Sequence, residues 1–284
     1  MADTGIFAPA WQEFEIELGR RPALYGPTVD DLVRGYNELG EVLASKLTFP
    51  APDLSVKTED RKLSPDLTVR IYTPPSYTGG KPAGLFIHGG GWVFGDLESE
   101  DGFARTVAKD TGLVLVSVDY RLAPKHKYPA ALDDCLIAYH WIMENSAYLN
   151  TTPGKIFTIG GSAGGCLSLA VALKLIDDGL GHSVKGVVAL APVTIHPDAC
   201  PQELKSSHTA YDENADLNIN TSSAMRAFFD AYGAPPTDPY VSPLLHARIK
   251  DLPKTYIAIC DRDTLRDDGR LLKKALHDAG AEQV

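Results

Sequence analysis

The sequence predicts an α/β protein with a mostly parallel sheet and helices on both faces. Short apolar runs rich in β-branched residues recur along the chain, and longer segments with helical periodicity separate the later ones. Such alternation is typical of a parallel sheet, because each crossover between parallel strands needs a helix-length connection. The strand-like runs are TVRIYTP, GLFIH, LVLVSVDY, KIFTIG, GVVALAP and TYIAIC, beginning at residues 68, 84, 113, 155, 186 and 255.

Helical periodicity first occurs at residues 28–45, where Leu32, Tyr36, Leu39 and Leu43 share one face. Further helices are expected in the segments 98–110, 130–146, 163–178, 222–232 and 266–279. The sequence contains no internal repeat, low-complexity segment or linker, so the chain is expected to form one continuous fold.

The alternation is interrupted once, between Pro192 and Thr255, by about sixty residues with polar turns. Structureless loops of that length are rare in compact domains, so an inserted cap with helices of its own is expected at about residues 197–235. Residues 1–50 are interpreted as an N-terminal helical cap segment, and residues 51–284 as the core that carries the insertion. Both cap segments are expected above the C-terminal edge of the sheet, where α/β folds bind ligands.

The bulk composition excludes several classes of protein. The net charge is −10, from 27 Lys and Arg against 37 Asp and Glu, which argues against a nucleic-acid partner. The four cysteines lie far apart, unlike those of a zinc site or a disulfide scaffold. The N-terminus is too acidic for a signal peptide, and no apolar run approaches the ~18 residues of a membrane span. A soluble, cytoplasmic protein without a membrane span is expected.

The pentapeptide GGSAG, residues 160–164, fits the G-x-S-x-G pattern at a transition from strand to helix. There a serine adopts a strained turn, and side chains on its neighbours would collide with the adjacent strand and helix. Ser162 is thus a candidate nucleophile, and the N–H of Ala163 a candidate oxyanion donor. Taken alone, the pentapeptide is equally compatible with a glycine-rich turn used for packing or for a phosphate.

A second glycine cluster, HGGGW at residues 88–92, directly follows the strand GLFIH. Three consecutive glycines expose backbone N–H groups that suit a developing oxyanion. His88, Gly89, Gly90 and Gly91 are therefore assigned to the oxyanion hole, with His88 as a structural anchor of the loop. A phosphate loop is the weaker alternative, because the lysine and Ser/Thr of that motif are missing.

Aromatic residues near these motifs are candidates for the substrate pocket. Trp92 and Phe94 follow the glycine cluster, and Phe228 and Phe229 belong to the expected cap. Each of them is equally well explained as core packing.

Five motifs in this order resemble the hormone-sensitive-lipase-like branch of the α/β-hydrolases, over residues 82–280. They are HGGGW (88–92), DYRLAPKHKYPAALDD (119–134), GGSAGG (160–165), DPYVSPLL (238–245) and DRDTLRDDG (261–269). The resemblance implies an α/β-hydrolase fold with a helical cap and the activity of a carboxylesterase or lipase on short-chain acyl esters. Fungal members include esterases of secondary metabolism. The family usually has aspartate before the nucleophile, where this chain has Gly161, but that side chain is not a reacting group.

The resemblance also assigns the triad acid to Asp263, just past the strand TYIAIC. A carboxylate there would hold an imidazole in the correct tautomer and stabilise its protonated form. Asp261 is the second candidate for this role. Asp267 and Asp268 are expected to be solvated charges near a helix N-terminus.

The triad histidine is expected after the acid, because the chain order in this fold is serine, acid, histidine. His277 alone follows Asp263, and it is expected on the surface near the end of a helix. His196 and His208 in the expected cap are the candidates that could approach the site. His126, His140, His182 and His246 also precede the acid. The segment AEQV, residues 281–284, is expected to begin a strand, and the rest of that strand and the histidine loop to be missing from this chain.

We therefore interpret the chain as a serine carboxylic-ester hydrolase that acts on short-chain or secondary-metabolite esters through an acyl-enzyme. It is expected to need no metal or organic cofactor and to have a small-molecule ester as its partner; a homodimer is compatible with the sequence. One alternative is a protein that binds a small ligand without hydrolysis, as the gibberellin receptors of this family do. Another is acyl transfer or cyclisation at the same serine.

Overall fold

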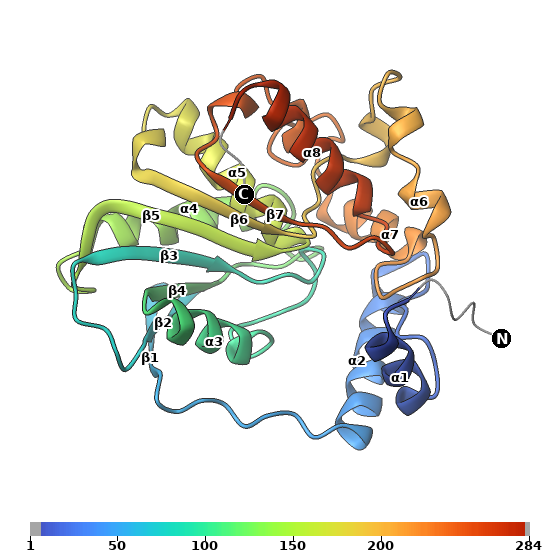
Figure 1. The fold of residues 1–284 in the computed structure, drawn as a ribbon, viewed down its shortest axis with the longest axis horizontal. Helices are drawn as coiled ribbons and strands as arrows, with labels where there is room; N and C mark the ends of the chain where they lie inside the picture. The colour runs from blue at the N-terminus through green and yellow to red at the C-terminus, as the bar shows by residue number, and fades with distance from the viewer. Residues whose placement is uncertain (1–6, 282–284) are drawn as a thin grey trace.

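The computed structural model describes residues 7–281, which form a seven-stranded sheet flanked by helices (Figure 1). The sheet order is β1-β2-β4-β3-β5-β6-β7, in which the pairs β1–β2 and β2–β4 are antiparallel and the other neighbours are parallel. The predicted α/β class is confirmed. The strands are β1 (Lys57–Ser64), β2 (Leu67–Thr73), β3 (Lys81–Ile87), β4 (Val114–Asp119), β5 (Thr151–Gly161), β6 (Val184–Leu190) and β7 (Thr255–Ala258).

The expected helices all form, and the helix expected at residues 222–232 has those bounds. The helix expected at 98–110 begins three residues later, at Asp101. The helices are α1 (Pro9–Leu18), α2 (Val29–Lys46), α3 (Asp101–Thr111), α4 (Ala130–Glu144), α5 (Ala163–Asp177), α6 (Ala210–Glu213), α7 (Ser222–Tyr232) and α8 (Arg266–Asp278).

The two faces of the sheet carry separate cores. Leu85 and Ile87 of β3 belong to the larger cluster, together with residues of α4, α5 and α8. Phe86, between them, points to the opposite face and packs in a smaller cluster with Ala104 and Ala108 of α3. The alternation follows from the two-residue period of a strand, because successive side chains point to opposite faces.

Three elements, the short helix α6, helix α1 and strand β1, were not predicted from the sequence. Helix α1 begins with Pro9 in its first turn and ends at Gly19, which has a left-handed φ of 79°. Strand β1 is almost wholly exposed at the edge of the sheet and has the sequence KTEDRKLS, which lacks the apolar alternation of a half-buried strand. Charged side chains on such an edge discourage pairing with another chain.

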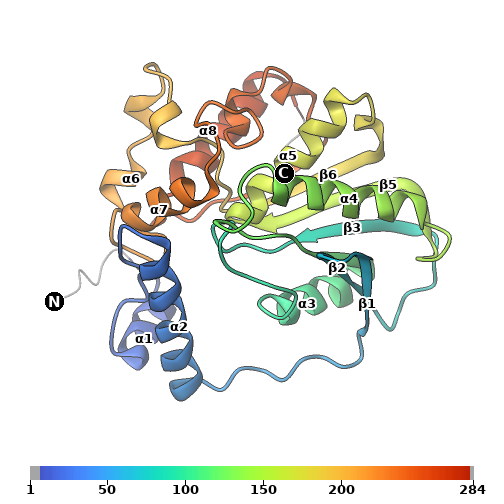
Figure 2. The ribbon, with the colours of Figure 1, turned by 180° about the vertical axis from the view of Figure 1, so that it is seen from behind.

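Helices α1, α2, α6 and α7, here called the helical group, lie beside the ends of the parallel strands (Figures 1 and 2). The amide of Leu24, between α1 and α2, donates to the carbonyl of Ile219 at 3.2 Å. The hydroxyl of Thr221, which caps α7, donates to the carbonyl of Leu24. The N-terminal helices and the insertion are thereby joined, although they are far apart in the sequence.

The strand expected to begin in residues 281–284 lies outside the described residues, except for Ala281. Within residues 7–281, no helix has both the length and the apolar character needed to cross a bilayer.

The insertion is fastened to the core by two carboxylates at the start of α8. Asp267 accepts hydrogen bonds from the amides of Thr209 and Ala210, each at 2.8 Å. Asp268 accepts from the Thr194 amide at 2.7 Å and contacts His208 Nε2 at 3.0 Å. Asp267 and Asp268 lie in the first turn of α8, as expected, but the prediction that they are solvated is wrong, because both are buried. Several donors on each carboxylate offset its desolvation.

We expect His208→Ala to destabilise the fold by about 3 kcal/mol, because it leaves the buried Asp268 without its imidazole partner. Burial opposes charge on His208, but the hydrogen bond and the charge of Asp268 outweigh it and raise the imidazole pKa above its usual 6.5. Stability from this pair is therefore complete below pH ~6.5 and declines as pH rises through the raised pKa. Urea unfolding at pH 6 and pH 9 measures both effects.

The matched control is His277→Ala, since His277 is an exposed histidine on α8 with a side chain 81% accessible. Equal urea midpoints for the two variants at pH 6 would contradict a stabilising role for the His208–Asp268 pair.

Candidate active site

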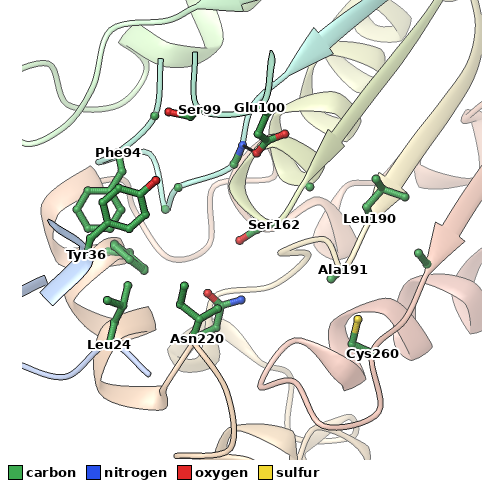
Figure 3. Close-up of a pocket in the computed structure, with 18 residues that line it drawn as sticks. Leu24, Tyr36, Phe94, Ser99, Glu100, Ser162, Leu190, Ala191, Asn220 and Cys260 are labelled. Atoms are coloured by element: carbon green, nitrogen blue, oxygen red, sulfur yellow. Dashed lines mark hydrogen bonds between the residues drawn. The ribbon is translucent and has the colours of Figure 1, made fainter. Parts of the chain in front are cut away.

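Ser162 occupies the turn between β5 and α5 in a strained backbone conformation, with φ 53° and ψ −119°. Its amide donates to the Leu190 carbonyl at 2.9 Å, and its carbonyl accepts from the Cys166 amide at 3.0 Å. Within residues 7–281 its hydroxyl makes no hydrogen bond to protein, and it lines a cavity of about 410 Å³ (Figure 3). The turn thus holds the hydroxyl in the open, as predicted.

The glycines around Ser162 allow two backbone segments to approach closely. A Cβ on Gly164 would lie 2.1 Å from the Ile87 carbonyl oxygen, and one on Gly160 would lie 2.4 Å from the Gly164 carbonyl oxygen. Real Cβ atoms do not come this close to backbone, so any larger residue would push α5 away from the end of β3. Side chains at these two positions would therefore collide with neighbouring backbone, as expected from the sequence.

The loop after β3 has the left-handed backbone that glycine permits. Gly90 and Gly91 have φ values of 102° and 60°, and both line the Ser162 cavity. In the described part of the chain, neither amide donates to a protein acceptor. The amide of Ala163 is at the first position of α5, where no intrahelical acceptor exists. Among residues 7–281, the amides of Gly90 and Gly91 thus have no protein partner in the cavity wall, whereas Ala163 is buried beside Ser162 and does not line the cavity.

Gly89 differs from its two neighbours. Its amide donates to Glu100 Oε1 at 2.9 Å, so it is already occupied in this structure. The prediction that Gly89 donates to an oxyanion does not agree with this arrangement. No local pattern predicts this contact, because Glu100 lies eleven residues away, just before α3.

His88 is buried beneath the glycine loop and does not line the cavity. Its ring stacks on Tyr120 at 4.2 Å between centroids, and its Nδ1 lies 2.8 Å from the Gly89 carbonyl oxygen. Since a carbonyl only accepts, Nδ1 carries the proton of the neutral ring. Burial lowers the pKa of His88. A neutral, packed imidazole fits the structural role expected for this residue.

The two aromatic residues after the loop have different environments. Phe94 lines the cavity, where its ring stacks on Tyr36 of α2 at 4.8 Å and contacts Phe228 of α7 edge-on (Figure 3). Trp92 is fully buried and stacks on Tyr232 at 4.5 Å. Trp92 is thus a core residue and not part of the cavity wall, contrary to the prediction.

Asp263 and Asp261, the two candidates for the triad acid, have different environments. Asp263 is buried in the loop between β7 and α8, where its Oδ1 accepts from the Leu265 amide at 2.9 Å. Burial raises the pKa of this carboxyl, while the Leu265 amide opposes the rise. Asn220, which lines the cavity, also hydrogen bonds to Asp263. Asp261 is exposed and pairs with Arg270 at 3.0 Å, a surface arrangement.

None of the eight histidines, all within the described residues, lines the Ser162 cavity. His208 is held by Asp268, and His246 contacts Asp177 at 3.1 Å. His196 packs on Phe229 at 4.3 Å, and its Nδ1 accepts from the Asp198 amide. The expectation that His196 or His208 approaches the site is therefore wrong, and His277 is exposed, as expected.

Sequence reasoning missed most of the cavity wall because its residues come from separate elements. The helical group and its loops contribute Leu24, Tyr36, Ile219 and Asn220. Leu190 and Ala258 are the last residues of β6 and β7, Ala191 and Cys260 lie just beyond those strands, and Ser99 and Glu100 precede α3. No local pattern connects these positions; only the rule that ligands bind at the carboxyl ends of parallel strands points to β6 and β7.

A serine on a strained strand-to-helix turn, facing glycine amides across a mostly apolar cavity, defines an α/β-hydrolase. A family model described as alpha/beta hydrolase fold matches residues 84–284. The chain belongs to this family, in its hormone-sensitive-lipase-like branch.

Several of the similar proteins are named as esterases. The chain is 48% identical over 273 residues to a versiconal hemiacetal acetate esterase of Aspergillus parasiticus, covering 96% of this chain and 85% of that protein. It is 36% identical over 221 residues to carboxylesterase NlhH of Mycobacterium tuberculosis, covering 76% and 66%. A thermostable esterase of Pseudomonas putida has a similar structure, with a TM-score of 0.80 at 26% identity, covering 97% and 84%. The chain is a serine ester hydrolase, and a ligand-binding protein without hydrolysis is not favoured.

We expect Gly164→Ala to lower the unfolding free energy by about 1–3 kcal/mol, because the new methyl group must displace the end of β3. The same displacement moves Ser162 away from the glycine loop, and misplacement by about 1 Å can cost ~10²-fold in rate. Urea unfolding and ester hydrolysis measure the two effects.

Gly40→Ala in α2 is the control, since a Cβ there meets nothing within 4 Å. It should be neutral or stabilising by up to about 1 kcal/mol, as for Gly→Ala in a helix interior. If Gly164→Ala behaved like Gly40→Ala, close approach at the turn would not be a requirement of the fold.

Proposed function

We propose that Ser162 attacks the carbonyl of an ester with a short acyl group and a bulkier alcohol, and that water then releases the acid from the acyl-enzyme. The supporting observation is the strained Ser162, whose free hydroxyl shares a cavity with the unoccupied amides of Gly90 and Gly91. Together with the Ala163 amide, these donors hold the oxyanion of each tetrahedral intermediate.

The proposed substrate class rests on the cavity and on the relatives. Most of the wall is apolar, and about 410 Å³ is enough for a small acyl group with part of its alcohol. Two similar fungal proteins are named as esterases of versiconal hemiacetal acetate, a name that specifies an acetyl group on a larger alcohol. An acetate ester of a fungal secondary metabolite is the best-supported substrate type.

The helical group serves as the cap of this site. Leu24, Tyr36 and Phe228 come from it and line the cavity opposite the strand ends. The four cysteines form no disulfide, which suits a reducing compartment such as the cytoplasm.

Asp263 is proposed to hold the imidazole that takes the Ser162 proton and returns it to the leaving alcohol. The histidines of residues 7–281 lie elsewhere, so no imidazole of the described residues stands in this position. In a serine protease, loss of the triad base costs roughly 10⁶ in kcat and leaves ~10³–10⁴ over water, supplied by the oxyanion hole and binding.

We expect Ser162→Ala to reduce the residual hydrolysis of 4-nitrophenyl acetate to the uncatalysed rate, because Ser162 is the nucleophile of the proposed mechanism. Release of 4-nitrophenol, followed at 400 nm, is the measurement, with Ser99→Ala as a control because Ser99 also lines the cavity. Unchanged turnover in the Ser162 variant would remove the nucleophile assignment.

Free imidazole should accelerate hydrolysis by the 284-residue chain, because it can supply the missing base beside Asp263. The rate of the Ser162→Ala variant at each imidazole concentration gives the background to subtract. Asp263→Asn should weaken the acceleration about tenfold or more, and Asp261→Asn should leave it unchanged, since Asp261 is exposed on the surface. Equal acceleration with and without the Ser162 hydroxyl would contradict this mechanism.

A further inference from the structure

Glu100 is a charged group in the cavity that the hydrolytic mechanism does not use. One carboxylate oxygen accepts from the Gly89 amide, and in the described part of the chain no cation forms an ion pair with it. Burial raises the pKa of this carboxyl, and the Gly89 hydrogen bond opposes that rise only in part. A half-buried carboxylate without a cationic partner costs free energy, so its presence in the cavity requires an explanation.

The position of Glu100 is also unfavourable for the hydrolysis itself. Its carboxylate lies on the loop that carries Gly90 and Gly91, whose amides stabilise negative charge in the proposed mechanism (Figure 3). A second negative charge nearby opposes that stabilisation. An uncharged acceptor would be enough to anchor the loop. The negative charge of Glu100 therefore points to a function in substrate recognition.

The space around Glu100 indicates which part of the substrate it meets. Ser99 and Glu100 line the Ser162 cavity and also a second cavity of about 700 Å³. Phe49, Pro52 and Phe103 form part of the wall of this second cavity. Glu100 therefore stands at the border of both cavities, so an ester whose larger portion occupies the second cavity would place that portion beside Glu100; in the short-acyl esters of the proposed function that portion is the alcohol.

We propose that Glu100 is a specificity-determining residue that accepts a hydrogen bond from a hydroxyl group on the alcohol portion of the ester. A carboxylate has acceptor capacity beyond the single bond to Gly89, and hydrogen bonds to charged acceptors are stronger than neutral ones. The same charge disfavours alcohols that carry a carboxylate. This inference rests on the proposed function, because it names the substrate class of that site.

Three acetates of matched shape test the inference: phenyl acetate, 3-hydroxyphenyl acetate and 3-acetoxybenzoate. With Glu100 intact, kcat/KM for the hydroxyl ester should exceed that for phenyl acetate about tenfold, as expected for one charge-assisted hydrogen bond. The carboxylate ester should be the poorest of the three. Binding of the same esters to the Ser162→Ala variant gives the order of Kd independently of turnover.

Two substitutions separate charge from hydrogen bonding. Glu100→Gln keeps an acceptor oxygen, so it should retain part of the hydroxyl preference and lose the discrimination against 3-acetoxybenzoate. Glu100→Leu should lose both. Glu144→Gln is the control for net charge, because Glu144 is exposed at the end of α4 and lines neither cavity; its substrate ratios should equal those of the unchanged chain.

If Glu100 only anchors the loop, Glu100→Leu lowers kcat/KM for all three acetates by the same factor, and unchanged ratios would overturn the inference. Failure of the proposed function would give a different result: the Ser162→Ala variant would still hydrolyse the acetates, independently of the rate ratios among the three esters.

Discussion

The site depends on one contact between two stretches of backbone: Gly164, in the first turn of α5, lies against the carbonyls of Ile87 and His88 at the end of β3. The contact is possible because neither Gly160 nor Gly164 carries a side chain. It brings the start of α5 to the loop after β3, so Ser162, the proposed nucleophile, shares one cavity with Gly90 and Gly91, two of the proposed oxyanion donors. Without this approach the same residues could still form a strand, a loop and a helix, but not a catalytic arrangement.

The backbone amides of the loop after β3 differ in whether they have a protein partner. The Gly89 amide is occupied by Glu100, and the buried His88 ring, stacked on Tyr120, holds the Gly89 carbonyl. The amides of Gly90 and Gly91 are left for a ligand, with backbone angles that a side chain would resist. The hydrogen bonds of Gly89 therefore fix the loop, while Gly90 and Gly91 are the proposed oxyanion donors. The Glu100 carboxylate, which binds the Gly89 amide, is also the proposed contact for the substrate.

Most helices and strands, and the turn at the proposed nucleophile Ser162, could be predicted from the sequence because local patterns specify them, whereas Asp263 was proposed from the family resemblance. The bounds of α7, the turn at Ser162 and the glycine loop all depend on neighbours in the chain. The exposed strand β1 was missed because it forms by pairing with β2, and its own side chains lack the alternation of a half-buried strand. Helix α1 was detectable from Pro9 and Gly19, a signal that the prediction did not use. The roles of Glu100, Asp267 and Asp268 depend on contacts with distant residues, and no local pattern encodes those.

The short segment from Asp261 to Asp268 connects Asp263, the proposed acid, to the insertion. Asp263 lies next to Asn220, while its own backbone carbonyl accepts from the Asn214 side chain at 2.8 Å. Both asparagines belong to the insertion, and Asp267 and Asp268 bind the same insertion a few residues further on. The position of the acid is therefore set as much by the insertion as by β7. A displacement of the insertion would move Asp263 relative to Ser162, so the proposed cap would support the proposed catalytic geometry as well as cover the cavity.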